Sequence, residues 1–364
     1  MDLRGLSLKF EEARNYRYFA AISLPEAEDI WFFCSNRIPE MKKVEIQKSS
    51  KPAFLFSPYG AGNMCYHLDA EKVYRNEELI RDERITDDEE VKDSANPDSA
   101  KGHCASREEF IHYVSKAVNE IRLGKCRKIV TARKEHLATG MSFQPASFFH
   151  TLKMHYPSAC VYYFTSPENG TWMGASPEKL VSVHEGNLNT IAMAGTMASG
   201  EDRAWTEKEK EEQHITGEFI KNVLEENKKA KVEISESTEM SAGNVKHIVQ
   251  SIRWNPGEEW MQKSFSKLLA RLNPTPAVCG FPASRANDFI VREEGIERRF
   301  YSGFIGMQKE GIDLFVNIRC MEITKGDAWF YAGAGITKDS DPEMEWEETA
   351  AKLDTLKSLL PLGM

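Results

Sequence analysis

The pattern of apolar and polar positions along the chain predicts many strands and a few long helices. Short apolar stretches at 30–33 and 53–56, with Pro/Gly turn signals such as Ser57-Pro58-Tyr59-Gly60, indicate strands in the first hundred residues. Further strands are expected at 159–165, 180–184 and 314–320, and helices near 207–227 and 343–360. The order shows neither regular strand–helix alternation nor a repeat, so it favours an α+β fold over parallel βαβ units.

One helix has clear signals at both ends. Ser106 and Glu109 form a capping box, apolar residues follow at helical spacing, and Gly124 ends the segment, which predicts a helix over about 107–123. The next segment, Lys128–Arg133, alternates like a strand, so Lys128 shares a face with apolar neighbours. Its ammonium either extends to the surface or is buried, and burial would lower its pKa and suit it to act as a base.

The composition is that of a globular protein, and its charge limits the partners to be expected. Of 364 residues, 41% are hydrophobic and 28% are charged, which is enough for a large core. The 47 basic and 56 acidic residues give a net charge of −9, so no general positive field attracts nucleic acid. No apolar run approaches the ~18–20 residues of a membrane span, and no signal peptide is visible. We therefore expect a soluble cytoplasmic protein without nucleic-acid or membrane partners.

Cysteine spacing and one acidic segment add two further expectations. The seven cysteines include no Cys-x-x-Cys pair, so we expect reduced, mostly buried thiols rather than disulfides or a zinc cluster. Residues 81–101 are polar and acidic. This segment either links an N-terminal portion to the rest of the chain or forms an exposed loop within one domain.

Two pairs of glutamates have the spacing of one helix face, Glu209 with Glu212 and Glu345 with Glu348. Like charges on one face repel each other unless something neutralises them, and carboxylates from two helices would suit a Mg²⁺ ion. The alternative is a pair of charged, solvated helix faces, which the run Glu207–Glu212 resembles. Spacing alone leaves both interpretations open.

Three further features suggest anion chemistry or a carboxylate in a site. Glu178 lies in a Ser-Pro-Glu turn before a strand, where it is either solvated or projected into a site. The segment Tyr331–Ile336 is expected to be a small-residue turn, which is either structural or lets backbone N–H groups approach a carboxylate. Arg319, expected within the strand 314–320, either lies at the surface or binds a carboxylate in a bidentate manner.

Taken together, these residues resemble the chorismate-utilising enzymes, a family of isochorismate, salicylate, anthranilate and aminodeoxychorismate synthases. The likeness covers about 105–360 and rests on motifs in the family's order: KIVTARKEHL, MGASPEKLVSV, IAMAGT, KEKEEQHITGEFIKNVL, NVKHIVQSI, NPTPAVCGFP, FYSGFIG, LFVNIRC and YAGAGITKDSDPEMEWEETAAKLDTL. It implies an α+β fold with a large two-layered antiparallel sheet core flanked by helices. It also implies one catalytic domain over 1–364, of which 1–100 form a variable N-terminal portion.

The resemblance assigns expected roles to individual residues. Lys128 would be the general base and Glu178 the general acid. Glu212 and Glu348 would ligate Mg²⁺, with Glu209 and Glu345 nearby or acting through water. Substrate binding would fall to Gly195, Thr196, His247, Ala277, Tyr301, Arg319, Gly333, Ala334 and Lys352. Gln213 stands where the family has a histidine, which puts in doubt any role tied to that histidine.

Within the family, the motifs favour an isochorismate synthase, which isomerises chorismate reversibly by attack of water at C2 and loss of the C4 hydroxyl. Pro274–Pro282 resembles this group rather than the ammonia-using synthases, so no glutaminase partner is expected. Anthranilate synthases lack the base that Lys128 supplies, and Ala194 stands where aminodeoxychorismate synthases often have a lysine. Salicylate synthases tend to have threonine in place of Ala277. Menaquinone and siderophore biosynthesis are both compatible with these motifs.

Overall fold

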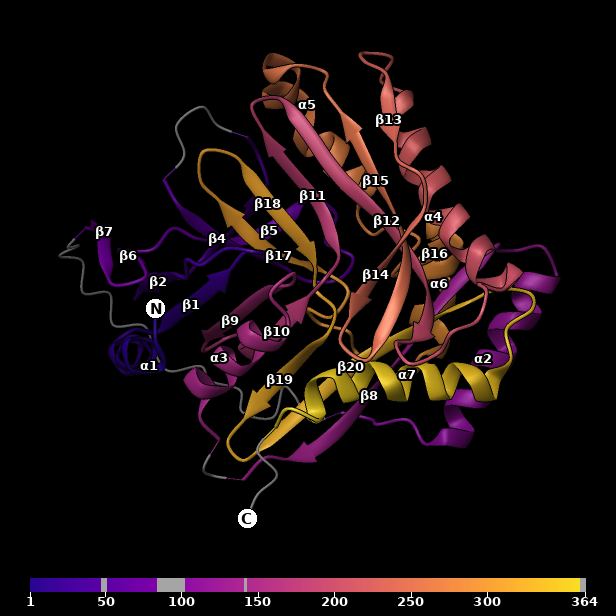
Figure 1. Cartoon of the computed structure of the whole chain (residues 1–364), viewed down its shortest axis with the longest axis horizontal. Coiled ribbons are helices and arrows are strands. Elements are labelled where there is room, and N and C mark those ends of the chain that lie inside the picture. The colour runs from indigo at the N-terminus through magenta and orange to yellow at the C-terminus, as the bar shows by residue number, and fades with distance from the viewer. Residues whose placement is uncertain (47–50, 84–101, 141–142, 361–364) are drawn as a thin grey trace.

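The computed structural model describes residues 1–46, 51–83, 102–140 and 143–360. Two large antiparallel sheets form its centre (Figure 1). The strands of the first sheet follow one another in the order β16 (Gly280–Phe281), β8 (Lys128–Ala138), β20 (Asp327–Ile336), β19 (Cys320–Thr324), β10 (Gly170–Ser176), β9 (Cys160–Ser166), β1 (Tyr18–Ser23), β2 (Trp31–Ser35), β6 (Lys72–Arg75) and β7 (Glu78–Asp82).

The second sheet is also antiparallel and shares the N-terminal region with the first. Its strands are β13 (Val232–Ile234), β15 (Val245–Trp254), β12 (Asn187–Ala198), β11 (Lys179–His184), β18 (Ile312–Val316), β17 (Phe304–Gln308), β4 (Ala53–Ser57), β5 (Met64–Leu68) and β3 (Glu40–Lys43), with β14 (Thr238–Ala242) beside β15. Strands from the first hundred residues thus extend both sheets: β1 pairs with β9, and β4 pairs with β17.

Aromatic side chains pack the two sheets against each other. In β1 every residue is buried, and alternate residues face opposite sides: Tyr18 faces the space between the sheets, and Phe19 packs under helices. Across the inter-sheet space, the ring centroids of Phe56 and Phe164 lie 4.5 Å apart. A strand apolar on both faces needs cover on both sides, which explains the layered arrangement.

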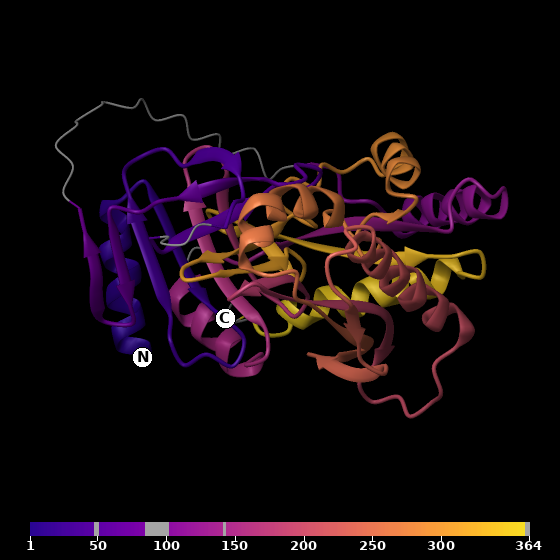
Figure 2. The same cartoon turned by 90° about the horizontal axis from the view of Figure 1, so that it is seen from above.

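Helices cover the outer faces of both sheets. The first sheet packs against α1 (Leu3–Glu12), which leads into a short 3₁₀ turn, and against α3 (Pro145–His155), while the second packs against α4 (Glu207–Glu225) and α5 (Glu258–Leu272). At the β8–β20 edge lie α2 (Arg107–Arg122), α6 (Ala283–Glu293) and α7 (Pro342–Lys357). Figure 2 shows the N-terminal elements at one end of the molecule and α2 at the other. None of the helices described is long and apolar enough to cross a membrane.

Most expected elements are found, with two corrections. The helix at 107–123 and its capping box are confirmed by α2, and the strand beginning at Lys128 by β8. The expected small-residue turn at Tyr331–Ile336 is wrong, because these residues complete β20 and pair with β8 as far as Ile129. Arg319 does not lie within a strand, since it sits in the connection from β18 to β19 with a φ of 49°. This connection carries the chain from the second sheet to the first.

The structure also describes the cysteines and the start of the acidic segment. All seven cysteines are free, and Cys104 alone among them is exposed, as expected. The acidic segment is described only up to residue 83, where β7 has ended, and its remainder at 84–101 lies outside the described residues.

Candidate active site

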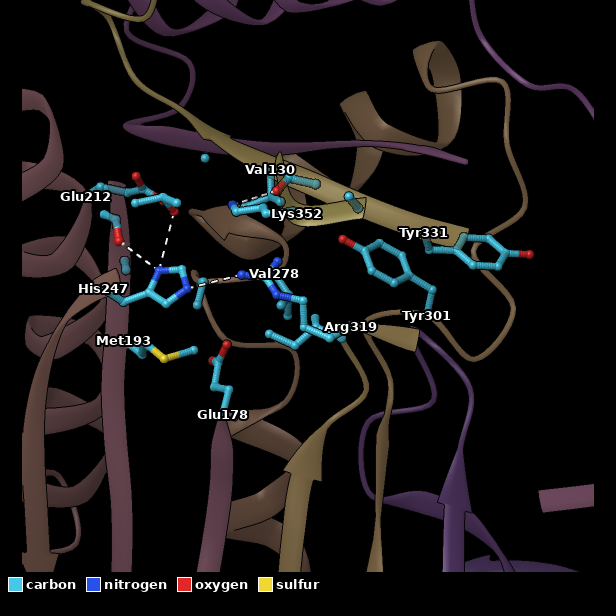
Figure 3. A pocket seen from close by; sticks show the side chains of 18 residues that line it. Val130, Glu178, Met193, Glu212, His247, Val278, Tyr301, Arg319, Tyr331 and Lys352 are labelled. Atoms are coloured by element: carbon cyan, nitrogen blue, oxygen red, sulfur yellow. Dashed lines mark hydrogen bonds between the residues drawn. The ribbon is translucent and has the colours of Figure 1, made fainter. Parts of the chain in front are cut away.

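A small cavity lies where the two sheets meet α4 and α7 (Figure 3). It has a volume of about 50 Å³, so a ring with two carboxylates needs side chains to move before it fits. Of the sequence-predicted site residues, Glu178, Gly195, Thr196, Glu212, His247, Ala277, Tyr301, Arg319, Gly333 and Lys352 line it. The remaining five, Lys128, Glu209, Ala334, Glu345 and Glu348, are not among the lining residues.

Lys128 begins β8 and is completely buried, so the alternative of an ammonium at the surface is wrong. Its Nζ lies 3.1 Å from Oε1 of Glu212, which does line the cavity. Burial lowers the pKa of Lys128, and the nearby carboxylates of Glu212 and Glu178 oppose this shift without reversing it. The ammonium is thus held just behind the cavity wall, with its charged form disfavoured.

Glu178 approaches the cavity from the turn before β11 and is also buried, so the alternative of a solvated turn residue is wrong. Burial raises its pKa to about 7, although Lys128, Lys352 and Arg319 pull the value down. The turn is fixed to the end of β18, because Oγ of Ser176 donates a hydrogen bond to the carbonyl of Val316 at 2.6 Å. A carboxyl with this pKa can carry a proton near neutral pH and donate it.

Arg319 and His247 form a linked pair on one wall of the cavity (Figure 3). Gly195, at a β-bulge in β12 with a φ of 71°, accepts a hydrogen bond from Nδ1 of His247 at 2.9 Å. This tautomer, assigned from the hydrogen-bond network, leaves Nε2 to accept from Nη2 of Arg319 at 3.2 Å. Burial and the adjacent Arg319 lower the pKa of His247 to about 3, so it is neutral. The Nε of Arg319 is buried without a hydrogen-bond partner, which leaves a donor for an anion.

Arg319 also lines a second cavity of about 220 Å³ on the other side, bordered by Tyr156, Pro177 and the hairpin residues Met240–Gly243. The larger cavity therefore adjoins the site through one arginine.

Lys352 and two glycines of β20 shape the opposite wall. The Nζ of Lys352 donates to the carbonyl of Gly333 at 2.8 Å and to Oε1 of Glu348 at 2.6 Å. A Cβ at Gly333 would lie 2.8 Å from the Tyr301 hydroxyl oxygen, and one at Gly335 would lie 1.9 Å from Oε1 of Glu212. At Gly333 the carbonyl oxygen of Thr131 would also lie 2.8 Å from the added Cβ, so both glycines make room for close neighbours rather than form a turn.

Three carboxylates gather beside the cavity, and the alternative of solvated helix faces is wrong for them. Glu212 comes from α4, and Glu345 and Glu348 come from successive turns of α7. Glu212 and Glu345 are buried, and one oxygen of each, Oε2, has no hydrogen-bond partner. Although burial opposes the shift, Lys352 and Lys208 hold the pKa of Glu348 below its ordinary value, whereas burial raises that of Glu345.

This donor set fits a hard divalent cation such as Mg²⁺, which prefers carboxylate oxygens. The unsatisfied oxygens of Glu212 and Glu345 are the observation that supports the fit, because buried carboxylate oxygens normally have donors. In the described residues, however, no group of three or more potential ligands is already arranged around a metal position. Lys208 lies among the carboxylates instead, with its Nζ 2.9 Å from Oε1 of Glu345.

Glu209 is held away from this group. Its carboxylate accepts two hydrogen bonds from the guanidinium of Arg203, at 2.8 and 3.0 Å, and others from its own helix N-cap Thr206. The two residues form a capping box at the start of α4. Gln213, at the position where the resemblance implies a histidine, donates to Oε1 of Gln250 at 2.7 Å.

Sequence reasoning missed a buried ion pair behind the cavity. The guanidinium of Arg298 donates to both oxygens of Glu294 at 2.6 Å and to the carbonyls of Val130 and Val278 at 2.8 Å. Val130 and Val278 line the cavity on separate segments, so the pair fixes two walls relative to each other. Sequence reasoning also missed Lys208 and Gly335. The Lys208–Glu212 spacing of four residues was readable, but the surrounding run of charges concealed it.

The comparisons with known proteins identify the family. The profile of the family described as chorismate binding enzyme matches residues 61–361. The chain belongs to this family. The salicylate biosynthesis isochorismate synthase of Pseudomonas aeruginosa is 30% identical over 276 residues, which is 72% of this chain but 57% of that relative. The chain thus spans little more than half the length of that relative.

Solved structures agree with this chorismate-binding fold. The menaquinone-specific isochorismate synthase MenF of Escherichia coli has a TM-score of 0.77 at 18% identity, covering 98% of this chain and 91% of that one. Anthranilate synthase component I of Streptococcus pneumoniae has a TM-score of 0.65 at 20% identity, covering 93% and 92%. At these identities the likeness concerns the fold, and it confirms the expected α+β architecture of two antiparallel sheets with flanking helices.

Proposed function

We propose that this chorismate-binding protein is an isochorismate synthase, an isomerase that converts chorismate reversibly to isochorismate with the help of Mg²⁺. The observation that carries the proposal is the placement of Lys128 and Glu178. Both are buried, Glu178 in the lining of the cavity and Lys128 directly behind its wall, and burial shifts the pKa of the lysine down and that of the glutamate up, to about 7. A base and an acid tuned in opposite directions suit a reaction that takes one proton and gives one back.

The proton transfers can be assigned to this chain's own atoms. The Nζ of Lys128, when neutral, takes a proton from the water that attacks C2 of the ring. The double bonds shift, the C4–O bond breaks, and the Glu178 carboxyl gives its proton to the departing hydroxyl, so that one water enters and one leaves. To act in this way, the Lys128 amine has to exchange its contact with Glu212 for a contact with that water.

The substrate carboxylates would be held by the cationic walls. Arg319 has a buried donor without a partner, and the neutral His247 positions its guanidinium. Lys352 offers a second cation on the opposite wall. These few cations at the site would attract a substrate with two negative charges, although the net charge of the protein is −9.

Mg²⁺ would be held by Glu212 and Glu348, with Glu345 adjacent, and when bound it would neutralise a substrate carboxylate and orient the ring. Glu209 would act only through the helix start that it caps.

Two other products are possible within the family. A salicylate synthase would carry the same water chemistry further, with elimination of pyruvate. Ala277, which lines the cavity, favours the isochorismate product because salicylate synthases tend to have threonine there. An ammonia-using synthase would need a glutaminase partner, and the cavity offers no lysine at Ala194 to act as a nucleophile.

Chromatographic product analysis tests the proposal. The purified chain is incubated with chorismate, with and without Mg²⁺, and with ammonium in a parallel sample. Isochorismate in equilibrium with chorismate, formed only with Mg²⁺ and unaffected by ammonium, is the expected result. Salicylate with pyruvate, or an aminated product, would replace the proposal by one of its alternatives.

For the pathway, we propose menaquinone or siderophore biosynthesis without choosing between them. Relatives named for menaquinone and for salicylate biosynthesis both match this chain, and the proposed product would serve either menaquinone or siderophore synthesis. We place the enzyme in the cytoplasm, where chorismate would be available to it.

A further inference from the structure

Three ammonium groups neutralise the three carboxylates beside the cavity, one for each. Lys128 contacts Glu212 at 3.1 Å, Lys352 contacts Glu348 at 2.6 Å, and Lys208 contacts Glu345 at 2.9 Å. With all six groups ionised, the formal charge of this cluster would be zero without any metal. A divalent cation that enters the cluster must either push one ammonium out or raise the local charge by two.

Lys208 is the ammonium that this cluster can release most easily. The side chain of Lys128 is 0% exposed, and that of Lys352 is anchored to the carbonyl of Gly333. The side chain of Lys208 is 17% exposed, and its contacts among the described residues are all to carboxylates, with no anchor on the backbone: it lies 2.9 Å from Glu345, to which it is hydrogen-bonded, 3.8 Å from Glu348 and 3.9 Å from Glu212.

The position of Lys208 in its helix also favours release. It is the second residue of α4, where the unpaired N–H groups of the first turn make a cation unfavourable. Its four-carbon stem begins next to the exposed residues Glu207 and Lys210, so the ammonium has a short way to solvent.

We propose that Lys208 is a built-in counter-ion that occupies the place of the divalent cation among Glu212, Glu345 and Glu348, and that the cation binds by displacing it. This inference rests on the metal site of the proposed function. It has two consequences. Lys208 stabilises the metal-free protein, because three buried carboxylates would otherwise repel one another. It also weakens Mg²⁺ binding, because the cation has to replace an existing charge-assisted contact.

Calorimetric titration of the 364-residue chain with MgCl₂, without chorismate, measures the second consequence directly. Lys208→Met keeps the length and packing of the stem and removes the charge. We expect Mg²⁺ to bind this variant at least about tenfold more tightly, since a charge-assisted contact accounts for roughly that factor. Lys210→Met is the matched control, because Lys210 lies on the same helix but pairs with Glu207 at the surface, and its Mg²⁺ affinity should equal that of the wild type.

Thermal unfolding in EDTA and in saturating Mg²⁺ measures the first consequence. Lys208→Met should melt below the wild type in EDTA, and the difference should shrink or reverse with Mg²⁺. Lys210→Met should melt like the wild type in both buffers. If Lys208→Met does not fold, Lys208→Arg serves instead. Its guanidinium retains the charge and grips carboxylates more firmly, so Mg²⁺ should bind several-fold more weakly than to the wild type.

The outcomes separate this inference from the proposed function. Equal Mg²⁺ affinities for the wild type and Lys208→Met would overturn the role of Lys208 and leave the metal site standing. Absence of Mg²⁺ binding in both proteins would overturn the metal site and the inference with it. Tighter binding in Lys208→Met, with the loss of melting temperature confined to EDTA, supports both.

Discussion

Two buried groups of acidic and basic side chains lie on either side of the cavity, and they are built differently. Behind the β8 wall, Glu294 accepts from both arms of Arg298, from the Tyr113 hydroxyl at 3.1 Å and from the Ala132 amide at 3.0 Å. In the cluster of Glu212, Glu345 and Glu348, two carboxylate oxygens have no hydrogen-bond partner.

This difference in bonding decides which charges can be exchanged. Arginine binds a carboxylate with a rigid, bidentate fork, and Arg298 uses its other N–H groups to hold two backbone carbonyls. Lysine is a point charge on a flexible stem, so the ion pairs that the lysines of the cluster form with their carboxylates can dissociate more readily. The pair of Arg298 and Glu294, whose hydrogen bonds are complete, stabilises the scaffold. The cluster of carboxylates, whose hydrogen bonds are incomplete, is suited to bind a cation and a substrate.

The largest effects are expected on turnover. Lys128→Ala and Glu178→Gln should each lower kcat by about 10²–10⁴, the usual contribution of a general base or acid. Both variants should keep the circular dichroism spectrum of the wild type. Steady-state kinetics with chorismate and Mg²⁺ measures the loss, and near-normal turnover in either variant would remove that residue from the mechanism.

The ion pair of Arg298 and Glu294 should contribute mainly to the stability of the fold. Arg298→Met leaves the Glu294 carboxylate buried without its partner, which should lower the free energy of unfolding by about 3–5 kcal/mol in urea denaturation. Lys116→Met is the control, since Lys116 pairs with the neighbouring Glu293 but is half exposed. A loss of less than about 1 kcal/mol for Arg298→Met would show that the Arg298–Glu294 pair does not stabilise the scaffold.

Glu178 should destabilise the fold at neutral pH, where its carboxyl loses its proton. Its pKa is raised from 4.5 to about 7, so the folded protein retains a proton that the unfolded chain loses between these values. Stability should therefore fall as pH rises from about 4.5 to 7.

Glu178→Gln should remove this loss, with a gain of about 1–3 kcal/mol at pH 8 and none at pH 4. Urea denaturation at both pH values tests this, and an equal gain at both would mean that ionisation is not the cause. Turnover of the wild type should decline above pH 7, where Glu178 loses the proton it has to donate.

Gly335→Ala should disturb the cluster with a smaller effect. The added methyl group would meet Oε1 of Glu212 and Cε of Lys128, at 1.9 and 2.9 Å, so the Glu212 side chain has to shift. We expect Mg²⁺ binding to weaken by about tenfold, equivalent to about 1.4 kcal/mol, in calorimetric titration. Gly303 is unsuitable as a control because of its backbone contacts, whereas Gly200→Ala meets open space and should change nothing.

The smallest effect is expected at the surface. Arg127, next to Lys128 in the sequence, pairs with Glu211 at 3.0 Å and Glu218 at 3.1 Å, and all three side chains are exposed. Arg127→Met should change the free energy of unfolding by less than about 0.5–1 kcal/mol. A loss comparable to that of Arg298→Met would show that burial does not decide the contribution of an ion pair here.

Much of this arrangement could be predicted from the sequence. The capping box at Ser106, the alternation at Lys128–Arg133 and the glutamate spacing on α4 and α7 are local signals, and the structure confirms the elements they indicate. The segment Tyr331–Ile336 was misjudged because glycines usually mark turns, whereas here they make room for Glu212 and the Tyr301 hydroxyl.

Most of the elements, the family and the types of group available for acid–base and anion chemistry follow from the sequence, because periodicity, caps and motifs are properties of neighbouring residues. Which of these groups are buried, and which charges meet, depends on the tertiary structure. Lys128 on β8 and Glu212 on α4 are 84 positions apart, and their contact depends on two sheets and a helix packing together. Burial and proximity set the protonation of Lys128 and Glu178 and the pairing of Lys208, because the cost of a buried charge depends on its whole surroundings.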